Sequence, residues 1–405
     1  MAYQDFNMDN HWLPFTPNRS FKKDPRVFVA ADGMYFTTHD GKKVIDGISA
    51  MWCTGAGHNR KPINDAVKRQ VDTLDYATAF QATNDKAARA AQMIAALAPG
   101  DLNKVLFCNS GSEAADTSMK VALAYHRARG EGQRNLFIGR EKGYHGVGFG
   151  GMSVGGMTAN RKVFGTSLLP RVDHMRFIHD PVHHAYYNGV EPEWQEDILL
   201  ELENRILPLH DPSNMAAIIV EPVAGSAGWY VPPKGYLKRL REICDKHGIL
   251  LIFDEVITGF GRLGTPFASD YYGVVPDMLN FAKCVTNAVI PLGGVICRDK
   301  LYDEMMKTSA PEHVIENKRA EQRFVAGETK KKPQKKQPEP GFVAWDKNTF
   351  DRLVDKPPEA LVSRFQISHG IMMSLLTKPD GYRRLVELVA LSHESDDKKR
   401  KHLQR

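Results

Sequence analysis

The sequence of 405 residues contains none of the long apolar runs that mark membrane proteins. No stretch approaches the length of about 18 apolar residues that a membrane-spanning helix needs. The N-terminal residues MAYQDFNMDNHW have neither the basic nor the apolar segment of a secretory signal. We therefore expect a cytoplasmic protein with no membrane partner.

Cysteine is scarce and shows no regular spacing. The five cysteines are scattered and form no CxxC pair: Cys53, Cys108, Cys244, Cys284 and Cys297. An odd number without a repeated spacing argues against a disulfide framework, and His183–His184 has no HExxH or cysteine neighbours. The sequence therefore predicts buried thiols and no metal site.

Charge is distributed unevenly along a chain of otherwise ordinary globular composition. Apolar residues make up 42% of the sequence and charged residues 25%, with a net charge of +6. Residues 317–405 contain 20 Lys and Arg against 12 Asp and Glu, and their first part is rich in Lys, Pro and Gln. This composition is typical of a linker and a basic tail that follow a separate folded part.

Up to about residue 316, strand-like apolar runs alternate with amphipathic helix-like stretches. The clearest strands are predicted at Lys104–Phe107, Met215–Val220, Ile249–Phe253 and Met278–Ala282. This alternation predicts an α/β fold with a parallel sheet. Nearer the N-terminus, the pairs Asp32-Gly33 and Asp40-Gly41 lie between short strand-like runs and predict a small hairpin layer.

Polar residues that can carry chemistry stand at the ends of several of these strands. Lys283 follows the run MLNFA, and Asp254 ends the run ILLIFD. The segment Asn109–Glu113 joins a strand to a helix that we expect to begin at Ser112, so its hydroxyls and free backbone N–H groups can bind phosphate. Each feature alone has an ordinary structural explanation: a surface lysine, a turn-capping aspartate or a helix N-cap.

Taken together, these residues fit the needs of pyridoxal phosphate (PLP). This cofactor needs a lysine for a Schiff base, an acid beside its pyridine nitrogen, a phosphate cradle and a group stacked on its ring. Tyr144, in the string Gly-Tyr-His-Gly with His145, is a candidate for stacking, and Glu221 adds a carboxylate at another strand end. The two strings that match GxGxxG lack the strand and helix context of a dinucleotide site.

The order of the motifs resembles the class III, fold type I PLP-dependent aminotransferases. The strings NSGSEA, GYHG, EPVAGSAG, DEVITGFGR and MLNFAKCVTNA occur in the order of that family. The resemblance covers about residues 10–316, and HWLPFTPNR and ISAMWCTGAGH are most like the β-alanine:pyruvate (ω-amino acid:pyruvate) aminotransferases. It implies a large domain with a mostly parallel, seven-stranded type of sheet, PLP as cofactor, an amino donor and a 2-oxo acid acceptor as substrates, and a homodimer.

The resemblance also implies a role for individual residues. Lys283 would carry the cofactor and move the proton, and Asp254 would bind the pyridine nitrogen. Tyr144 would cover one face of the ring and Val256 the other, and Trp52 would line the substrate pocket. The remaining cofactor-binding candidates are the phosphate cradle and its neighbours: Ser110, Gly111, Ser112, His145 and Glu221.

The resemblance to aminotransferases ends near residue 316. We expect residues 1–60 to begin a small domain, 61–316 to form the PLP-binding large domain, 317–341 to be a basic linker and 342–405 to be a helical segment. This last segment resembles a non-motor part of superkiller-type DExH-box RNA helicases. The segment that would supply a phosphate-binding threonine, and the arginine that would bind the substrate carboxylate, have no counterpart in the sequence. We therefore expect an incomplete small domain, a chimeric chain and impaired transamination.

Two alternatives stay open at this point. One is an inactive chimera whose basic tail, with the strings KKKPQKK and KKRKH, binds nucleic acid nonspecifically. The other is a different class III reaction on the same cofactor, such as an aminomutase, because motifs shared across the class do not separate these reactions.

Overall fold

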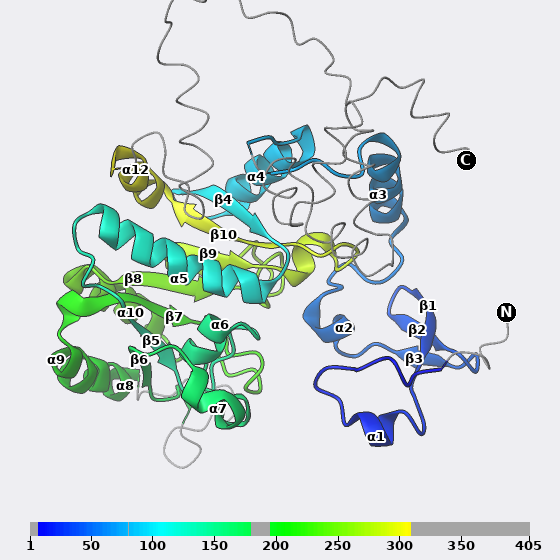
Figure 1. Ribbon diagram of the computed structural model, residues 1–405, viewed down its shortest axis with the longest axis horizontal. Helices are drawn as coiled ribbons and strands as arrows, with labels where there is room; N and C mark the ends of the chain where they lie inside the picture. The colour runs from blue at the N-terminus through cyan, green and yellow to red at the C-terminus, as the bar shows by residue number, and fades with distance from the viewer. Residues whose placement is uncertain (1–6, 80, 180–194, 309–405) are drawn as a thin grey trace, which may run out of the picture. The chain divides into compact units, whose positions relative to one another are not determined.

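The computed structural model describes residues 7–79, 81–179 and 195–308 (Figure 1). The chain divides into two units, residues 1–323 and 324–405, and the described residues belong to the first. Within these ranges, no helix is both long and apolar enough to cross a bilayer. The predicted linker, the helical segment beyond it and His183–His184 lie outside the described residues, so the predictions made for them stay predictions.

A seven-stranded sheet forms the centre of the described structure, in the strand order β4-β10-β9-β8-β7-β5-β6. Six strands run parallel, and β10 runs antiparallel to both of its neighbours, β4 and β9. The strands are β4 (Leu102–Cys108), β5 (Leu136–Arg140), β6 (Val172–Met175), β7 (Met215–Val220), β8 (Leu250–Asp254), β9 (Met278–Phe281) and β10 (Gly293–Arg298).

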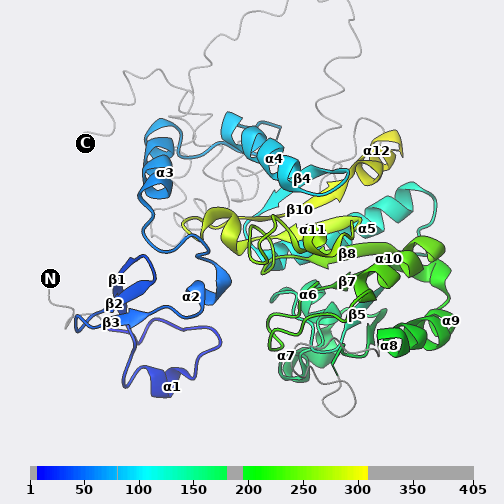
Figure 2. The same cartoon turned by 180° about the vertical axis from the view of Figure 1, so that it is seen from behind.

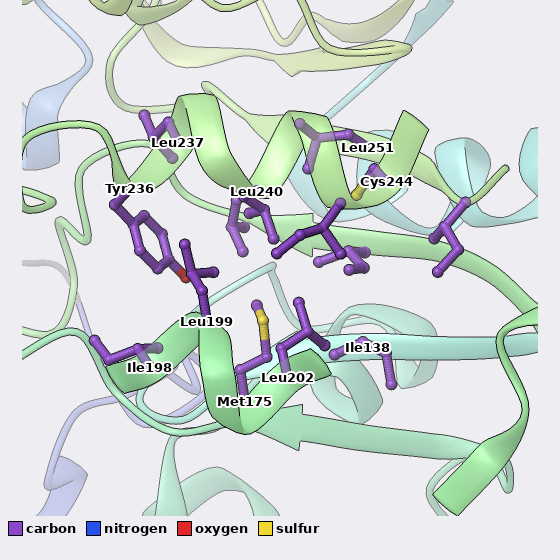
Figure 3. Close-up of a cluster of buried hydrophobic side chains, with 14 of the residues drawn as sticks. Ile138, Met175, Ile198, Leu199, Leu202, Tyr236, Leu237, Leu240, Cys244 and Leu251 are labelled. Atoms are coloured by element: carbon purple, nitrogen blue, oxygen red, sulfur yellow. The ribbon is translucent and has the colours of Figure 1, made fainter. Parts of the chain in front are cut away.

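Helices cover both faces of this sheet, which Figures 1 and 2 show from opposite sides. Neighbouring residues of β7 illustrate the two faces. Ile218 packs in the cluster with helices α8 (Gln195–Glu201) and α10 (Tyr236–His247), while Ile219 packs in the cluster with α5 (Gly111–Ala128). The sequence of a strand that is buried on both faces is a continuous apolar run, as it is in Met215–Val220. Figure 3 shows side chains of α10 and of the α8 segment meeting those of β5, β6 and β8 between them.

The helices of this α/β part precede, connect or follow the strands of the central sheet in sequence. They are α4 (Asp85–Leu97), α5 (Gly111–Ala128), α6 (Phe149–Val154), α7 (Thr158–Phe164), α8 (Gln195–Glu201), α9 (Leu207–His210), α10 (Tyr236–His247), α11 (Ala268–Tyr272) and α12 (Asp299–Thr308). Short 3-10 turns are η2 (Gly165–Ser167), η4 (Pro212–Asn214) and η5 (Lys283–Thr286), and η3 (Leu202–Ile206) is a π-helical turn.

The N-terminal residues form a separate three-stranded antiparallel sheet in the order β1-β2-β3. Gly33 and Gly41, both with positive φ, lie in the turns that connect its strands, so the predicted hairpin layer is confirmed. Its strands and the neighbouring helices are β1 (Phe28–Asp32), β2 (Tyr35–Thr38), β3 (Lys43–Ile45), α1 (Asn18–Phe21), α2 (Ser49–Trp52) and α3 (Lys61–Thr73).

The predicted strands of the central sheet are also confirmed, with shifts of one or two residues at their ends. The predicted start of α5 is wrong by one residue. The helix begins at Gly111, because Ser110 is the N-cap: its side chain accepts a hydrogen bond from the backbone N–H of Glu113 at 3.2 Å.

Candidate active site

A pocket of about 700 Å³ lies at the edge of the sheet where the parallel strands end. Asp254 ends β8, Lys283 follows β9 and Glu221 follows β7. Because the carboxyl ends of parallel strands meet at one edge of a sheet, these residues come together although they are far apart in the sequence. All ten predicted site residues line this one pocket: Trp52, Ser110, Gly111, Ser112, Tyr144, His145, Glu221, Asp254, Val256 and Lys283.

Lys283 occupies a tight turn directly after β9. Its φ of 52° places it in the left-handed region, which is uncommon for a residue other than glycine. Its Nζ donates a hydrogen bond to the Met51 carbonyl at 3.3 Å and lies 5.6 Å from the centroid of the Trp52 ring. The backbone turn therefore places the partly buried Lys283 in the lining of the pocket.

Asp254 is held by a hydrogen bond from His145. His145 Nδ1 lies 2.8 Å from Asp254 Oδ2, and the backbone N–H of Val256 donates to Asp254 Oδ1 at 3.2 Å. Both side chains are buried, at 6% exposure for Asp254 and 2% for His145. Because a carboxylate only accepts, Nδ1 donates this hydrogen bond, and Nε2 has no hydrogen-bond partner among the described residues.

The N-terminus of α5 forms a cradle of closely packed backbone. A Cβ atom built on Gly111 would lie 2.8 Å from a methyl group of Val256, and one on Gly293 would lie 2.6 Å from the Ser110 carbonyl oxygen. Gly146, with a φ of 96°, packs against Ser112 in the same way. Free N–H groups at a helix N-terminus attract an anion, so this end of the pocket suits a phosphate.

Glu221 joins two loops that border the pocket. Its carboxylate accepts from the backbone N–H of Tyr144 and from that of Gly225, both at 3.0 Å. Burial raises the pKa of Glu221 above its usual range. Burial also raises the pKa of the Tyr144 phenol, and the carboxylates of Asp254 and Glu221 raise it further. Glu221 thus fixes the loop that presents Tyr144.

The segment Ser49–Trp52 contributes Met51 and Trp52 to the wall of the pocket. All four of its residues have positive φ, between 47° and 66°, and each such residue costs of order 1–3 kcal/mol. Asp46 accepts a hydrogen bond from the Ala50 N–H at 2.7 Å, and the Trp229 ring meets the Trp52 ring edge-on at 5.5 Å. A strained segment of this kind persists only when its surroundings hold it in place.

Several pocket residues were not predicted from the sequence. These include Phe15, Met51, Cys53, Met157, Asn160, Ser226, Ile257, Thr286, Ala288, Ile290, Pro291 and Leu292. The residues after Lys283 could have been found from their position next to it, since a turn after a strand end borders the same edge. Met51 could have been found in the same way, next to Trp52, whereas Phe15 has no predicted site residue beside it in the sequence.

Two families match the sequence in adjacent parts. The family described as Aminotransferase class-III matches residues 18–313, and a domain of unknown function, DUF3516, matches residues 310–405. The description of the second family names no function, so the resemblance of this segment to helicases stays a prediction.

Curated proteins and solved structures resemble the same part of the chain. An omega-aminotransferase of Caulobacter vibrioides is 52% identical over 74% of this chain and 68% of its own length. A beta-alanine–pyruvate aminotransferase of Pseudomonas aeruginosa is 51% identical over 77% of this chain and 69% of its own.

Among solved structures, an omega transaminase from Pseudomonas jessenii in complex with PMP has a TM-score of 0.71 at 29% identity, over 76% of this chain and 67% of that one. A PLP-bound amine transaminase from an uncultivated Pseudomonas species has a TM-score of 0.68 at 34% identity, over 73% of this chain and 66% of that one.

Proposed function

Because the chain belongs to the class-III aminotransferase family, a group of PLP-dependent enzymes with fold type I, we propose that its pocket transfers an amino group from an ω-amino acid such as β-alanine to pyruvate. The observation that carries the proposal is the convergence of Lys283, Asp254 and the cradle before α5 in one pocket. The reaction needs a lysine, a buried acid and an anion site within the reach of one small molecule.

The residues of the pocket fit PLP by three structural criteria. A Cβ atom on Gly111 would clash with Val256 and one on Gly146 with Ser112, so glycine backbone forms the cradle at both positions. Asp254 is a buried carboxylate with a fixed orientation, suited to a protonated ring nitrogen. Lys283 lines the same pocket, so an amine is present in it to hold the carbonyl of the cofactor.

When bound, PLP supplies a carbonyl that takes up the amino group and a ring that withdraws electrons. Lys283 would hold the cofactor covalently through Nζ, and in its free form this amine would accept the proton from the amine-bearing carbon of the donor. Asp254 would keep the ring nitrogen protonated, and His145 orients Asp254 for that purpose. Tyr144 and Val256 line the pocket from different loops and would enclose the ring between them.

We further propose that turnover by this chain is slower than in its relatives. The chain spans about two thirds of the length of the curated relatives it matches. Apolar side chains of the N-terminal part are exposed, among them Trp12 at 88%, Phe15 at 78% and Ile45 at 63%. We also propose that the protein forms a homodimer and acts in the cytoplasm.

The first experiment tests cofactor attachment and turnover separately. The purified chain is mixed with PLP, treated with borohydride and digested, and the modified peptide is identified by mass spectrometry. We expect the cofactor on Lys283, no attachment in Lys283→Ala, and unchanged attachment in Lys307→Ala, an exposed lysine on α12. Alanine formation from β-alanine and pyruvate then measures the reaction, and a labelled lysine other than Lys283 would contradict the proposal.

A further inference from the structure

One cation next to the pocket has no part in the chemistry described above. Arg262 follows the loop after β8, is partly buried and does not line the pocket. Its Nη2 donates to the Trp52 carbonyl at 3.2 Å and approaches Cys284 Sγ at 3.4 Å. Arg262 therefore connects the pocket wall to the turn that carries Lys283.

The carbonyl of Trp52 accepts hydrogen bonds from both Arg262 and Cys284. Cys284 Sγ also donates to it, at 3.3 Å, so this carbonyl accepts two hydrogen bonds from outside its own segment. At the other end of the segment, Asp46 accepts from Ala50. Both ends of the strained segment are thus attached to groups outside it, Asp46 at one end and Arg262 with Cys284 at the other.

We propose that Arg262 is a positioning residue that fixes Trp52 as the substrate-facing wall of the pocket and so sets which amino donors fit. This inference rests on the proposed function for its consequence, though not for its geometry. A guanidinium keeps its charge at all relevant pH values and forms charge-assisted hydrogen bonds, which are stronger than those of a neutral donor.

Lys283 cannot replace Arg262 in this role. Its Nζ donates to the neighbouring carbonyl, that of Met51, at 3.3 Å. Once this nitrogen holds the cofactor, it is no longer a free ammonium group that can donate in the same way. Arg262 lies outside the pocket, so its hydrogen bond to Trp52 persists whether or not Lys283 is engaged.

Loss of the Arg262 contact should therefore affect binding more than chemistry. In Arg262→Met we expect the KM for β-alanine to rise roughly tenfold, the size expected when a charge-assisted hydrogen bond is lost, and kcat to change by less than about threefold. The preference for β-alanine over a bulkier aromatic amine should fall by a similar factor. Arg262→Lys keeps one charged donor and should restore most of both values.

The position of the wall can also be measured without any turnover. The amide of Trp52 donates to the Ile48 carbonyl, and those of Cys53 and Thr54 to the Ser49 carbonyl, at 2.8–3.0 Å, so hydrogen exchange reports on the order of this segment. In Arg262→Met we expect exchange over residues 49–54 to quicken by roughly tenfold and exchange over α5 to stay unchanged. The matched control is Arg239→Met, since Arg239 lies on α10 and pairs with Glu203 and Glu242.

The two measurements separate the two proposals. Faster exchange over residues 49–54 in Arg262→Met, in a protein that does not transaminate at all, would support the role of Arg262 and refute the proposed function. Unchanged exchange and an unchanged donor preference in an active protein would overturn the role of Arg262. A rise in exchange that Arg262→Lys does not reverse would also overturn it, because the contact would then not depend on a charged donor.

Discussion

Replacing Glu221 with Gln tests how the pocket is held together. Glu221 is 4% exposed and uses its two carboxylate oxygens separately, one for the N–H of Tyr144 and one for that of Gly225. Glutamine has one acceptor oxygen, so its amide NH₂ would face one of these N–H groups. One hydrogen bond is lost and two donors are left opposed in a buried site.

The structure gives a scale for this effect. A buried donor left without its acceptor costs about 1–3 kcal/mol. We expect Glu221→Gln to lower the free energy of unfolding by that amount. We also expect the Kd for PLP to rise roughly tenfold, because the loop with Tyr144 must then be ordered when the cofactor binds.

Urea unfolding measures the stability, and titration of the apoprotein with PLP measures the Kd. Glu242→Gln is the matched control, since Glu242 is half exposed on α10 and pairs only with Arg239 among the described residues. If Glu221→Gln leaves both quantities unchanged, the reasoning is refuted: Glu221 would then be a neutral acid that glutamine mimics, in keeping with its raised pKa.

Three further predictions concern stability. Asp277→Asn should lower the unfolding free energy by about 3–5 kcal/mol in urea, because buried Asp277 pairs with Arg241 and Lys300; a loss below about 1 kcal/mol would contradict this. Asn280→Leu should raise the unfolding free energy by about 1 kcal/mol, because neither polar atom of the buried Asn280 side chain has a hydrogen-bond partner among the described residues. A decrease in the unfolding free energy would contradict this and would indicate a partner such as a buried water. Burial lowers the pKa of His126 below its usual 6.5, so the stability that the neutral imidazole contributes is complete above pH 6.5 and is lost as the pH falls below it. The thermal midpoint of His126→Gln should therefore decline less steeply than that of the unmodified protein between about pH 7.5 and 5. An equal slope in the two proteins would refute this.

The residues at the ends of the strands could be identified from the sequence. Apolar runs that end in Asp254 and Lys283 are visible without any structure, because a strand buried on both faces leaves a continuous apolar signal. The carboxyl ends of parallel strands share one edge, so these residues could be expected in one pocket. The start of α5 was harder to place, since Ser110 and Ser112 are both good N-caps and only the backbone distinguishes them.

The tertiary structure alone decided how these residues pair. The hydrogen bond from His145 to Asp254 depends on which loops come together above the ordered sheet, and no spacing in the sequence encodes that. The same holds for Arg262 and Trp52, which are 210 residues apart and meet at a single carbonyl. Local patterns record burial and turns, whereas contacts between distant segments follow from strand order and from the path of strained loops.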